Sequence, residues 1–399
     1  MKRIILILLI TIFFILKADA QSVFSGFENG IGLRQYVTTT RGMGLGGTGL
    51  AIRDSTALNS YNLAAWRYID NTKINISMRY TYVSTDLSIQ KFSSSTANFA
   101  GLKLAIPIKK KRWVFGLSIT PYSSCNFSYI LKFQNTSRPY EENVYYEGNL
   151  SRAQLGLIWS PHERLALSLG LNYFFGAIKD RYYLIFNDPA IVDNFYVIDY
   201  QFRGPGIGTG IHFNLMKNLH VGGFLDLKPS INYTLVRRSQ VSLQEEETIT
   251  KTDFPLFGGI GSSYQFHPQW SVNADFAIQN WEKGLNNQKK AENIEKYYQL
   301  GIGIEHSHIR GKTKLFLNKF DTRLGFSYSN MGYLVNGNSI KEYAAHIGFG
   351  IPFFHDHARL DLAFIGGIRG DKNETLAEET FFKSFISISA GELWFQKVR

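Results

Sequence analysis

The chain has 399 residues, a formal net charge of +11, one cysteine and 15% aromatic residues. A single cysteine excludes a fold held together by internal disulfides, and no stretch after the leader is apolar over the roughly 20 residues that a spanning helix needs. The basic residues are spread along the chain and do not form a face interleaved with aromatics, so we expect no nucleic-acid partner.

Residues 1–20 predict a secretory signal peptide. Lys2 and Arg3 precede an apolar run from Ile4 to Leu16, and the sequence Ala18-Asp19-Ala20 has the A-x-A pattern of a cleavage site. The chain is therefore expected to be exported. A long exported chain that is rich in glycine and aromatics but lacks disulfides indicates a large β-structure in the outer membrane of a Gram-negative bacterium.

Residues 21–70 contain the stretch "GMGLGGTG", in which Gly42, Gly44 and Gly47 have the spacing of a dinucleotide-binding turn. Such a turn follows a buried strand and precedes a helix, whereas the polar "RQYVTTTR" precedes Gly42. We therefore predict no nucleotide and no other cofactor. The segment is too short for a domain and too apolar for a free tail. We expect it to be a plug, with glycines where its backbone is pressed against a wall.

Alternation with a period of two residues begins after residue 70 and predicts strands. In "KINISMRYTYV" the apolar face is formed by Ile74, Ile76, Met78, Tyr80 and Tyr82. Matching the chain to this pattern gives about fourteen strands. They lie near 73–83, 97–107, 112–122, 144–159, 165–177, 196–213, 219–235, 254–266, 270–281, 296–306, 322–331, 342–353, 358–368 and 381–396.

The connections between these strands alternate in length over most of the chain. Short ones at 108–111, 160–164, 214–218 and 267–269 alternate with long ones at 123–143, 178–195, 236–253 and 282–295, and only 307–321 breaks the rhythm. Tight turns on one side and long loops on the other are typical of outer-membrane barrels rather than of soluble β-sandwiches. Trp113, Trp159, Trp270 and Trp394 fall at the expected periplasmic rim and Trp281 at the opposite rim, where interfacial tryptophans gather.

These observations predict an all-β fold, a transmembrane antiparallel β-barrel of about 14 strands over residues 71–399, with residues 21–70 as a hatch or plug in its lumen. A closed barrel is required because lipid cannot satisfy the backbone groups of a sheet edge. The apolar faces then contact lipid, and the polar faces point inward, so the lumen is expected not to be an apolar core. In the strand at 196–213, Gly204, Pro205 and Gly206 predict a kink in the wall.

The segment "RGMGLGGTGLAIRDSTALNSYNLAAW" resembles the N-terminal hatch of the FadL-type outer-membrane transporters, which reads R-x-x-G-x-G-G-A-x-x-A-x-x-D-D-x-S-A and then N-P-A-G-L. The sequence departs from this pattern at Leu63, where the family has proline, at Ala65, where it has glycine, and in having one acid where two are common. The matching residues are Arg41, Gly44, Gly46, Gly47, Gly49, Ala51, Asp54, Ala57, Asn62 and Ala64.

The resemblance implies a channel that admits hydrophobic small molecules, such as long-chain fatty acids, when its hatch shifts. The hatch residues that it assigns to gating are Gly44, Gly46, Gly47, Asp54, Asn62, Leu63 and Ala64. A related branch, the PorV-like proteins of type IX secretion, has the same barrel but holds exported cargo, so a surface scaffold with secretion-machinery partners is the alternative. The replacement of proline by Leu63 removes a fixed φ and bears on this choice.

Other polar groups give weaker signals. His306 and His308, like His355 and His357, place two imidazoles two residues apart, but neither pair has a clear third ligand, so we predict solvated turn residues and no metal. No setting suggests an activated nucleophile, and we expect neither catalytic residues nor an enzyme. Asp54 could latch the plug by pairing with a wall arginine, for which Arg79 and Arg323 are the candidates.

Overall fold

The computed structural model describes residues 22–26, 31–87, 91–134, 139–188, 190–227, 229–240, 246–281, 293–308, 319–353 and 358–392. The predicted signal peptide lies outside the described residues. The plug segment contains η1 (Val23–Ser25), β1 (Leu33–Arg34), α2 (Thr40–Met43) and η2 (Leu63–Tyr68). The wall contains β2 (Thr72–Asp86), β3 (Lys91–Lys109), β4 (Trp113–Phe133), β5 (Tyr140–His162), β6 (Leu165–Phe186), β7 (Asn194–Asn214), β8 (Leu219–Asp226), β9 (Ser230–Ser239), β10 (Glu246–Asp253), β11 (Phe257–His267), β12 (Trp270–Asn280), β13 (Ile294–His306), β14 (Asp321–Val335), β15 (Asn338–Phe353), β16 (Ala358–Asp371), α3 (Lys372–Thr375) and β17 (Ala377–Glu392).

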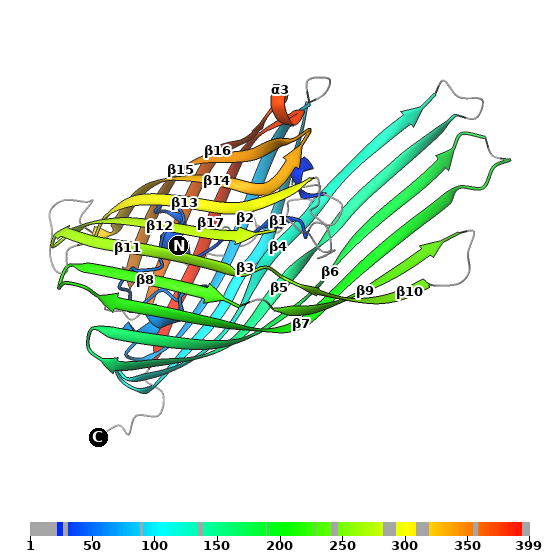
Figure 1. Ribbon diagram of the computed structural model, residues 1–399. Coiled ribbons are helices and arrows are strands. Elements are labelled where there is room, and N and C mark those ends of the chain that lie inside the picture. Colours follow the sequence, from blue (N-terminus) through cyan, green and yellow to red (C-terminus); the bar gives the residue numbers. More distant parts are fainter. Residues whose placement is uncertain are drawn as a thin grey trace, which may run out of the picture.

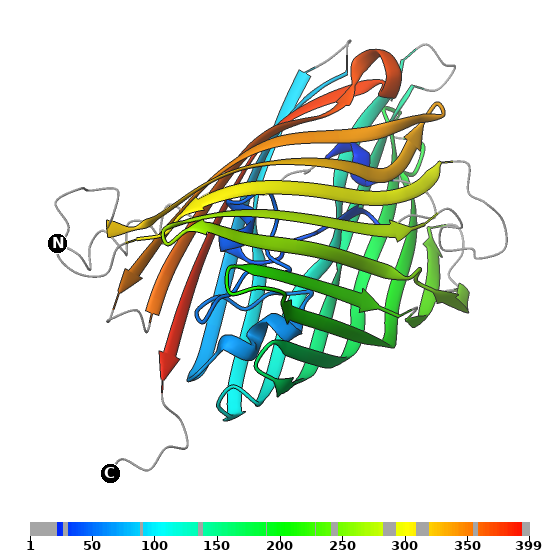
Figure 2. The same cartoon turned by 60° about the vertical axis from the view of Figure 1, so that its left-hand side comes forward.

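The wall is a closed antiparallel barrel, as the alternation predicts (Figures 1 and 2). It closes where β17 pairs with β2, from Glu378 with Asp86 to Glu392 with Thr72. Two pairs of short strands each share one position in the wall. β7 is bordered by β9 at 196–203 and by β8 at 208–214, and β10 and β11 border these two in turn. Counted by position, the barrel therefore has fourteen strands.

The period-two pattern gives the strands an apolar outer face. In β6, Leu167, Leu169 and Leu171 are 36%, 53% and 55% exposed, while the intervening residues point inward. We call the end with the connections 110–112, 163–164, 215–218 and 268–269 the turn end, and the opposite end the loop end. Among the residues that the structure describes, no helix is both long and apolar enough to span a membrane.

The interior corrects the expectation of a polar lumen. Polar side chains fill the turn end, but an apolar cluster packs nearer the loop end. This cluster includes Phe24, Ile31, Leu33, Tyr122, Phe174, Phe202, Phe254, Trp281, Ile294, Met331 and Tyr333. Trp281 is 5% exposed and belongs to this cluster, so its expected place in a rim of membrane tryptophans is wrong. Trp113 and Trp159 do stack at the turn end, with ring centroids 5.9 Å apart. Trp394 lies outside the described residues.

The strands that border the loop end are longer than expected. β4 to β7 have 21, 23, 22 and 21 residues, so much of the segments 123–143 and 178–195 is strand, not loop. The same holds for 236–253, where β9 ends and β10 lies. In Figure 1 the far parts of β4 to β7 form a sheet that extends to the upper right, away from β11 to β16. Aromatic side chains occur on both faces of these extensions, which obscures the alternation in the sequence.

Candidate functional site

The glycine stretch of the plug lies directly on the inner wall. The hydroxyl of Thr39 accepts a hydrogen bond from the Gly42 amide at 2.8 Å and begins α2. The chain then turns through Gly46 and Gly47, whose φ angles are +76° and +81°. A Cβ on Gly46 would lie 2.4 Å from the carbonyl oxygen of Phe326. Only glycine fits here, because both the φ angle and the backbone contact exclude a side chain.

The wall also has glycines where it receives the plug. A Cβ on Gly301 would lie 2.2 Å from the carbonyl oxygen of Gly46, and one on Gly303 would lie 2.6 Å from that of Leu45. Gly348 faces Gly44 in the same way, at 2.9 Å from its Cα. Backbone thus packs against backbone across the interface between α2 and strands β13 to β15. Substitution on either side separates the two.

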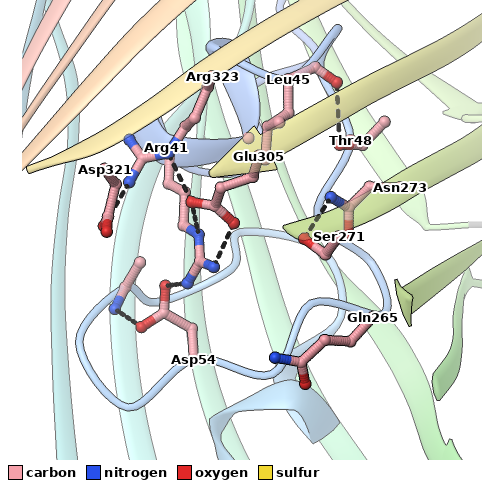
Figure 3. Close-up of polar contacts among 12 residues, drawn as sticks. Arg41, Leu45, Thr48, Asp54, Gln265, Ser271, Asn273, Glu305, Asp321 and Arg323 are labelled. Atoms are coloured by element: carbon pink, nitrogen blue, oxygen red, sulfur yellow. Dashed lines mark hydrogen bonds and ion pairs between the residues drawn. The ribbon is translucent and has the colours of Figure 1, made fainter. Parts of the chain in front are cut away.

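Arg41 connects the plug to the wall by two carboxylates (Figure 3). Its guanidinium lies 2.5 Å from Asp54 of the plug and 2.6 Å from Glu305 at the turn end of β13. A second nitrogen of Arg41 donates to the other oxygen of Glu305 at 3.0 Å, so this contact is bidentate. Bidentate arginine–carboxylate contacts are strong and fix orientation. Arg41 therefore holds the plug at a defined position on β13.

Asp54 is kept ionised by these neighbours. Burial alone raises the pKa of the Asp54 carboxyl, but Arg41 and Arg359 together with hydrogen bonds lower it further, to about 2. One carboxylate oxygen accepts hydrogen bonds from the Thr56 hydroxyl at 2.7 Å and from the Ala57 amide at 3.0 Å. The pKa of Arg41 is raised, since Glu305 and Asp54 outweigh the effect of burial. Both ends of this contact are charged at neutral pH.

The network continues along the wall at the turn end. Arg323 donates to Glu305 at 2.8 Å and to Asp361 at 2.8 Å, and it lies 3.2 Å from Asp321. Arg359 contacts the same two aspartates. Three arginines and four carboxylates thus form one buried cluster, which joins the plug to β13, β14 and β16. The hypothesis that Asp54 pairs directly with Arg79 or Arg323 is wrong, because its partner is Arg41 and Glu305 connects that pair to Arg323.

The second half of the hatch motif packs against the opposite side of the barrel. Asn62 caps η2, its side-chain oxygen accepting from the Ala64 amide at 3.1 Å. Its amide nitrogen donates to the Leu50 carbonyl at 2.7 Å and to Ile211 of β7 at 2.9 Å. Leu63 packs where Gly156 leaves room, 2.4 Å from the position that a Cβ would take. With Leu63 in place of proline, η2 still begins at this residue.

Three further contacts fix the plug. Asp275 of β12 accepts hydrogen bonds from the Gly49 and Leu50 amides at 2.7 and 2.9 Å. Arg152 of β5 donates to the Ser60 carbonyl at 2.5 Å. At the first described residue, the hydroxyl of Ser22 donates to Glu379 of β17 at 2.8 Å. The plug is therefore bonded to strands around the whole barrel.

The wall opens beside the plug where two neighbouring strands separate. β3 and β4 pair only from Leu102 with Ile119 to Lys109 with Trp113, although β3 begins at Lys91. Beyond this point β4 is contacted from inside by β1 of the plug, at Ser123 and Ser124. The strands separate near a β-bulge that follows Pro121 and at Gly101, whose φ is +155°.

A cavity of about 370 Å³ occupies this opening. Its lining includes Asn98 and Phe99 of β3, Ser124 of β4 and Asn149 of β5. Arg79 also lines it, and the same side chain lines a smaller cavity between plug and wall. The opening thus adjoins the interior at Arg79. We refer to this feature as the β3–β4 opening.

The remaining sequence predictions lie elsewhere. Gly204, Pro205 and Gly206 belong to the continuous strand β7, opposite the interval between β8 and β9, and a kink in the open state stays a prediction. His308 hydrogen-bonds Asp321 at 2.8 Å, while His355 and His357 are outside the described residues. In the described part of the chain, no group of three potential ligands could hold a metal ion.

Sequence reasoning did not identify the role of Arg41 or the β3–β4 opening. Arg41 was noted only as a match to the hatch pattern, yet it is a charged residue in a segment expected to be buried, and that combination indicates a partner. The opening had a signal in Pro121, which lies within an alternating run and marks a bulge or an edge. Arg34, a second charged residue of the buried segment, was also missed.

A family model described as BamG matches residues 1–399. No curated protein sequence matches the chain. Among solved structures, a FadL homologue of Pseudomonas aeruginosa superposes with a TM-score of 0.67 at 12% identity, covering 90% of this chain and 98% of the other. The Pseudomonas putida toluene transporter TodX gives 0.62 at 14% identity, with coverages of 90% and 99%. The Ralstonia pickettii toluene transporter TbuX gives 0.58 at 12%, with 92% and 99%. At these identities the likeness shows a shared fold.

Proposed function

The chain belongs to the BamG family, and from this premise we propose that it is an outer-membrane barrel that admits hydrophobic small molecules past its plug. The solved structures that share its fold include two described as toluene transporters. The apolar outer face and the filled interior are those of a barrel that lies in lipid and is closed along its axis. A hydrophobic molecule would therefore leave sideways into the bilayer.

The observation that carries this proposal is the β3–β4 opening. It lies where the wall has lost its strand pairing, next to the plug segment that pairs with β4 in place of β3. Asn98 and Asn149, on β3 and β5, line it without contributing to the buried ion cluster. A molecule moving between the interior and the lipid would pass these side chains.

Uptake into liposomes tests the proposal. Protein reconstituted into vesicles should transfer a fluorescent long-chain fatty acid or toluene faster than protein-free vesicles do. The double substitution Asn98→Trp and Asn149→Trp should reduce the rate at least about threefold, because two indoles fill much of the opening. Thr209→Trp, on the exposed face of β7, is the matched control and should leave the rate unchanged. Equal rates with and without wild-type protein would refute the proposal.

A second candidate function is a PorV-like surface scaffold, and one observation favours it. β4 to β7 are about twice as long as the 9–11 residues that cross a bilayer, so their far parts would stand outside the membrane as a sheet. This sheet is rich in tyrosine, which is enriched at protein interfaces. The residues are Tyr129, Tyr140, Tyr145, Tyr146, Tyr182, Tyr183, Tyr196 and Tyr200.

Cross-linking in intact cells separates the two functions. A scaffold should cross-link to secreted or secretion-machinery proteins through a photoreactive residue at position 145, and a hydrophobic-molecule channel should not. A photoreactive residue at position 169, on the apolar band of β6, is the control and should capture neither class of partner.

A further inference from the structure

A small cavity between the plug and the wall holds buried positive charge without matching negative charge. The cavity measures about 70 Å³. It is lined by four cationic side chains, namely Arg34 of β1, Arg79 of β2, Arg369 of β16 and Lys383 of β17. A single carboxylate, that of Glu342 on β15, lines the same cavity.

The carboxylates near this cavity are already shared by two of the four cations. Glu342 accepts from Arg369 at 2.9 Å and lies 3.4 Å from the ammonium of Lys383. Arg369 reaches a second carboxylate, Glu379, at 2.9 Å. These two acids therefore balance Arg369 and Lys383. Arg34 and Arg79 have no carboxylate within salt-bridge distance among the residues that the structure describes.

Both remaining guanidiniums are buried and incompletely hydrogen-bonded. Arg34 and Arg79 are 7% and 5% exposed. In the described part of the chain, Nε and Nη1 of Arg34 and Nε of Arg79 have no hydrogen-bond partner, and neither does the hydroxyl of Tyr36, which lines the same cavity. Arg34 stacks on the ring of Tyr122, 3.6 Å from its centroid, and Arg79 contacts the side-chain oxygen of Gln35.

Such an arrangement is unfavourable without a further ligand. Arginine remains protonated in proteins, and a buried charge that has neither a partner nor water carries a large desolvation penalty. Donor groups left unsatisfied in a polar cavity indicate a ligand that supplies acceptors. Guanidinium groups match the planar, bidentate geometry of oxyanions.

We propose that this cavity, lined by Arg34, Arg79, Lys383 and Tyr36, binds a small oxyanion such as phosphate or a short carboxylate. The bound oxyanion accepts hydrogen bonds from a plug residue and from wall residues at once and so joins the plug to β2 and β17. A water needs roughly 10–15 Å³ of such space, so the cavity holds an ion of a few heavy atoms and leaves no room for an acyl chain. The site is therefore separate from a path for hydrophobic molecules.

Binding of inorganic phosphate to the full-length protein in detergent tests the proposal. After removal of phosphate by dialysis, calorimetric titration with phosphate at constant ionic strength should show one saturable site, and phosphate should raise the melting temperature. Chloride at the same ionic strength is the reference. If phosphate and acetate both fail to bind the wild-type protein, the proposal is wrong and water alone fills the cavity.

Two variants and a control assign the binding to these residues. Arg79→Gln should weaken phosphate binding at least tenfold, and Arg34→Gln should do the same, so that either variant suffices if the other fails to fold. Both should be at least as stable as the wild type in the absence of anions, because a buried charge without a partner has been removed. Arg203→Gln, at an exposed arginine of β7, should bind like the wild type.

Octanoate distinguishes this site from a path for hydrophobic molecules. It has the carboxylate but also a chain too long for the cavity, so it should bind far more weakly than acetate. Equal binding of octanoate, lost in Arg79→Gln, would overturn the small-oxyanion proposal and assign Arg79 to the β3–β4 opening instead. Failure of fatty-acid uptake leaves the phosphate titration unaffected, so the two proposals fail independently.

Discussion

Arg41 and Asp54 show how a single pair of residues fixes the plug. Asp54 receives hydrogen bonds from its own turn, and Arg41 transfers that order to Glu305 on the wall. The cluster around them is buried, and removal of one member of a buried network leaves the others with uncompensated charge. The gating residues of the hatch motif are therefore also its stabilising residues.

The low pKa of Asp54 predicts a pH-dependent contribution to stability. Its folded-state value of about 2 is below the ordinary 3.8, so ionised Asp54 stabilises the fold by about 2 kcal/mol. This contribution is complete above about pH 4 and is lost as the pH falls toward 2. The difference in unfolding free energy between the wild type and Asp54→Asn should therefore be about 2 kcal/mol at pH 7 and should shrink at pH 3.

Glu141→Gln is the control for this measurement. Glu141 pairs with Lys132 at 2.8 Å, but the two side chains are 30% and 59% exposed, and exposed pairs contribute less than about 1 kcal/mol. Denaturant titrations of the three proteins in detergent at both pH values give the comparison. A difference for Asp54→Asn that is the same at pH 7 and pH 3 would contradict the assignment of charge to this carboxyl.

At the scale of elements, the plug and the wall fit because glycine occurs on both sides of their contact. Gly46→Ala should lower the stability of the barrel by roughly 2 kcal/mol or more, because alanine must adopt a positive φ and its Cβ must displace the carbonyls of Phe326 and Ile302. Protease sensitivity of the plug and ion conductance of the barrel should both increase.

Gly366→Ala is the matched control for this prediction. A Cβ on Gly366 would meet nothing within 4 Å, so the substitution should change stability by no more than about 0.5 kcal/mol. If Gly46→Ala behaved like Gly366→Ala, the close approach of the plug to β13 and β14 would not be a constraint on the fold.

The elements themselves were largely predictable. Each expected strand corresponds to a strand position in the barrel, since alternation of apolar and polar residues is a local signal. The division of one expected strand into β8 and β9 was not predicted, because the bordering strand β7 determines it. The extensions of β4 to β7 were missed for a different reason: in "NFSYILKF" and "VYYE" aromatic or apolar residues occupy adjacent positions. The partner of Asp54 could not be derived either, since Glu305 is 251 positions away in sequence from its plug neighbour in Figure 3, a separation that only the closed barrel brings together.

At the scale of the whole molecule, the barrel has an apolar band near the turn end and strands that continue beyond it. If the proposed location in a membrane is correct, Leu169→Arg should destabilise the protein in a bilayer by about 2–4 kcal/mol, because it places a charge on the lipid face. Leu169 is 53% exposed and lies within β6.

Leu131→Arg supplies the comparison. Leu131 is 44% exposed but lies near the loop end of β4, in the extended sheet. A charge there should remain in water and change stability by less than about 0.5 kcal/mol. Unfolding in lipid vesicles measures both. Equal losses at the two positions would contradict a membrane boundary between them and would remove the extended sheet as a surface feature.

The hydrogen bond between Ser22 and Glu379 restricts the order in which the molecule can be assembled. Ser22 precedes the rest of the described chain, while Glu379 belongs to the last strand, β17. During biogenesis the leading segment cannot reach its final position until the final strand has arrived, so insertion of the barrel and seating of its interior must finish together. A chain that stalls before β17 would carry an unsettled leading segment, which marks it as incomplete.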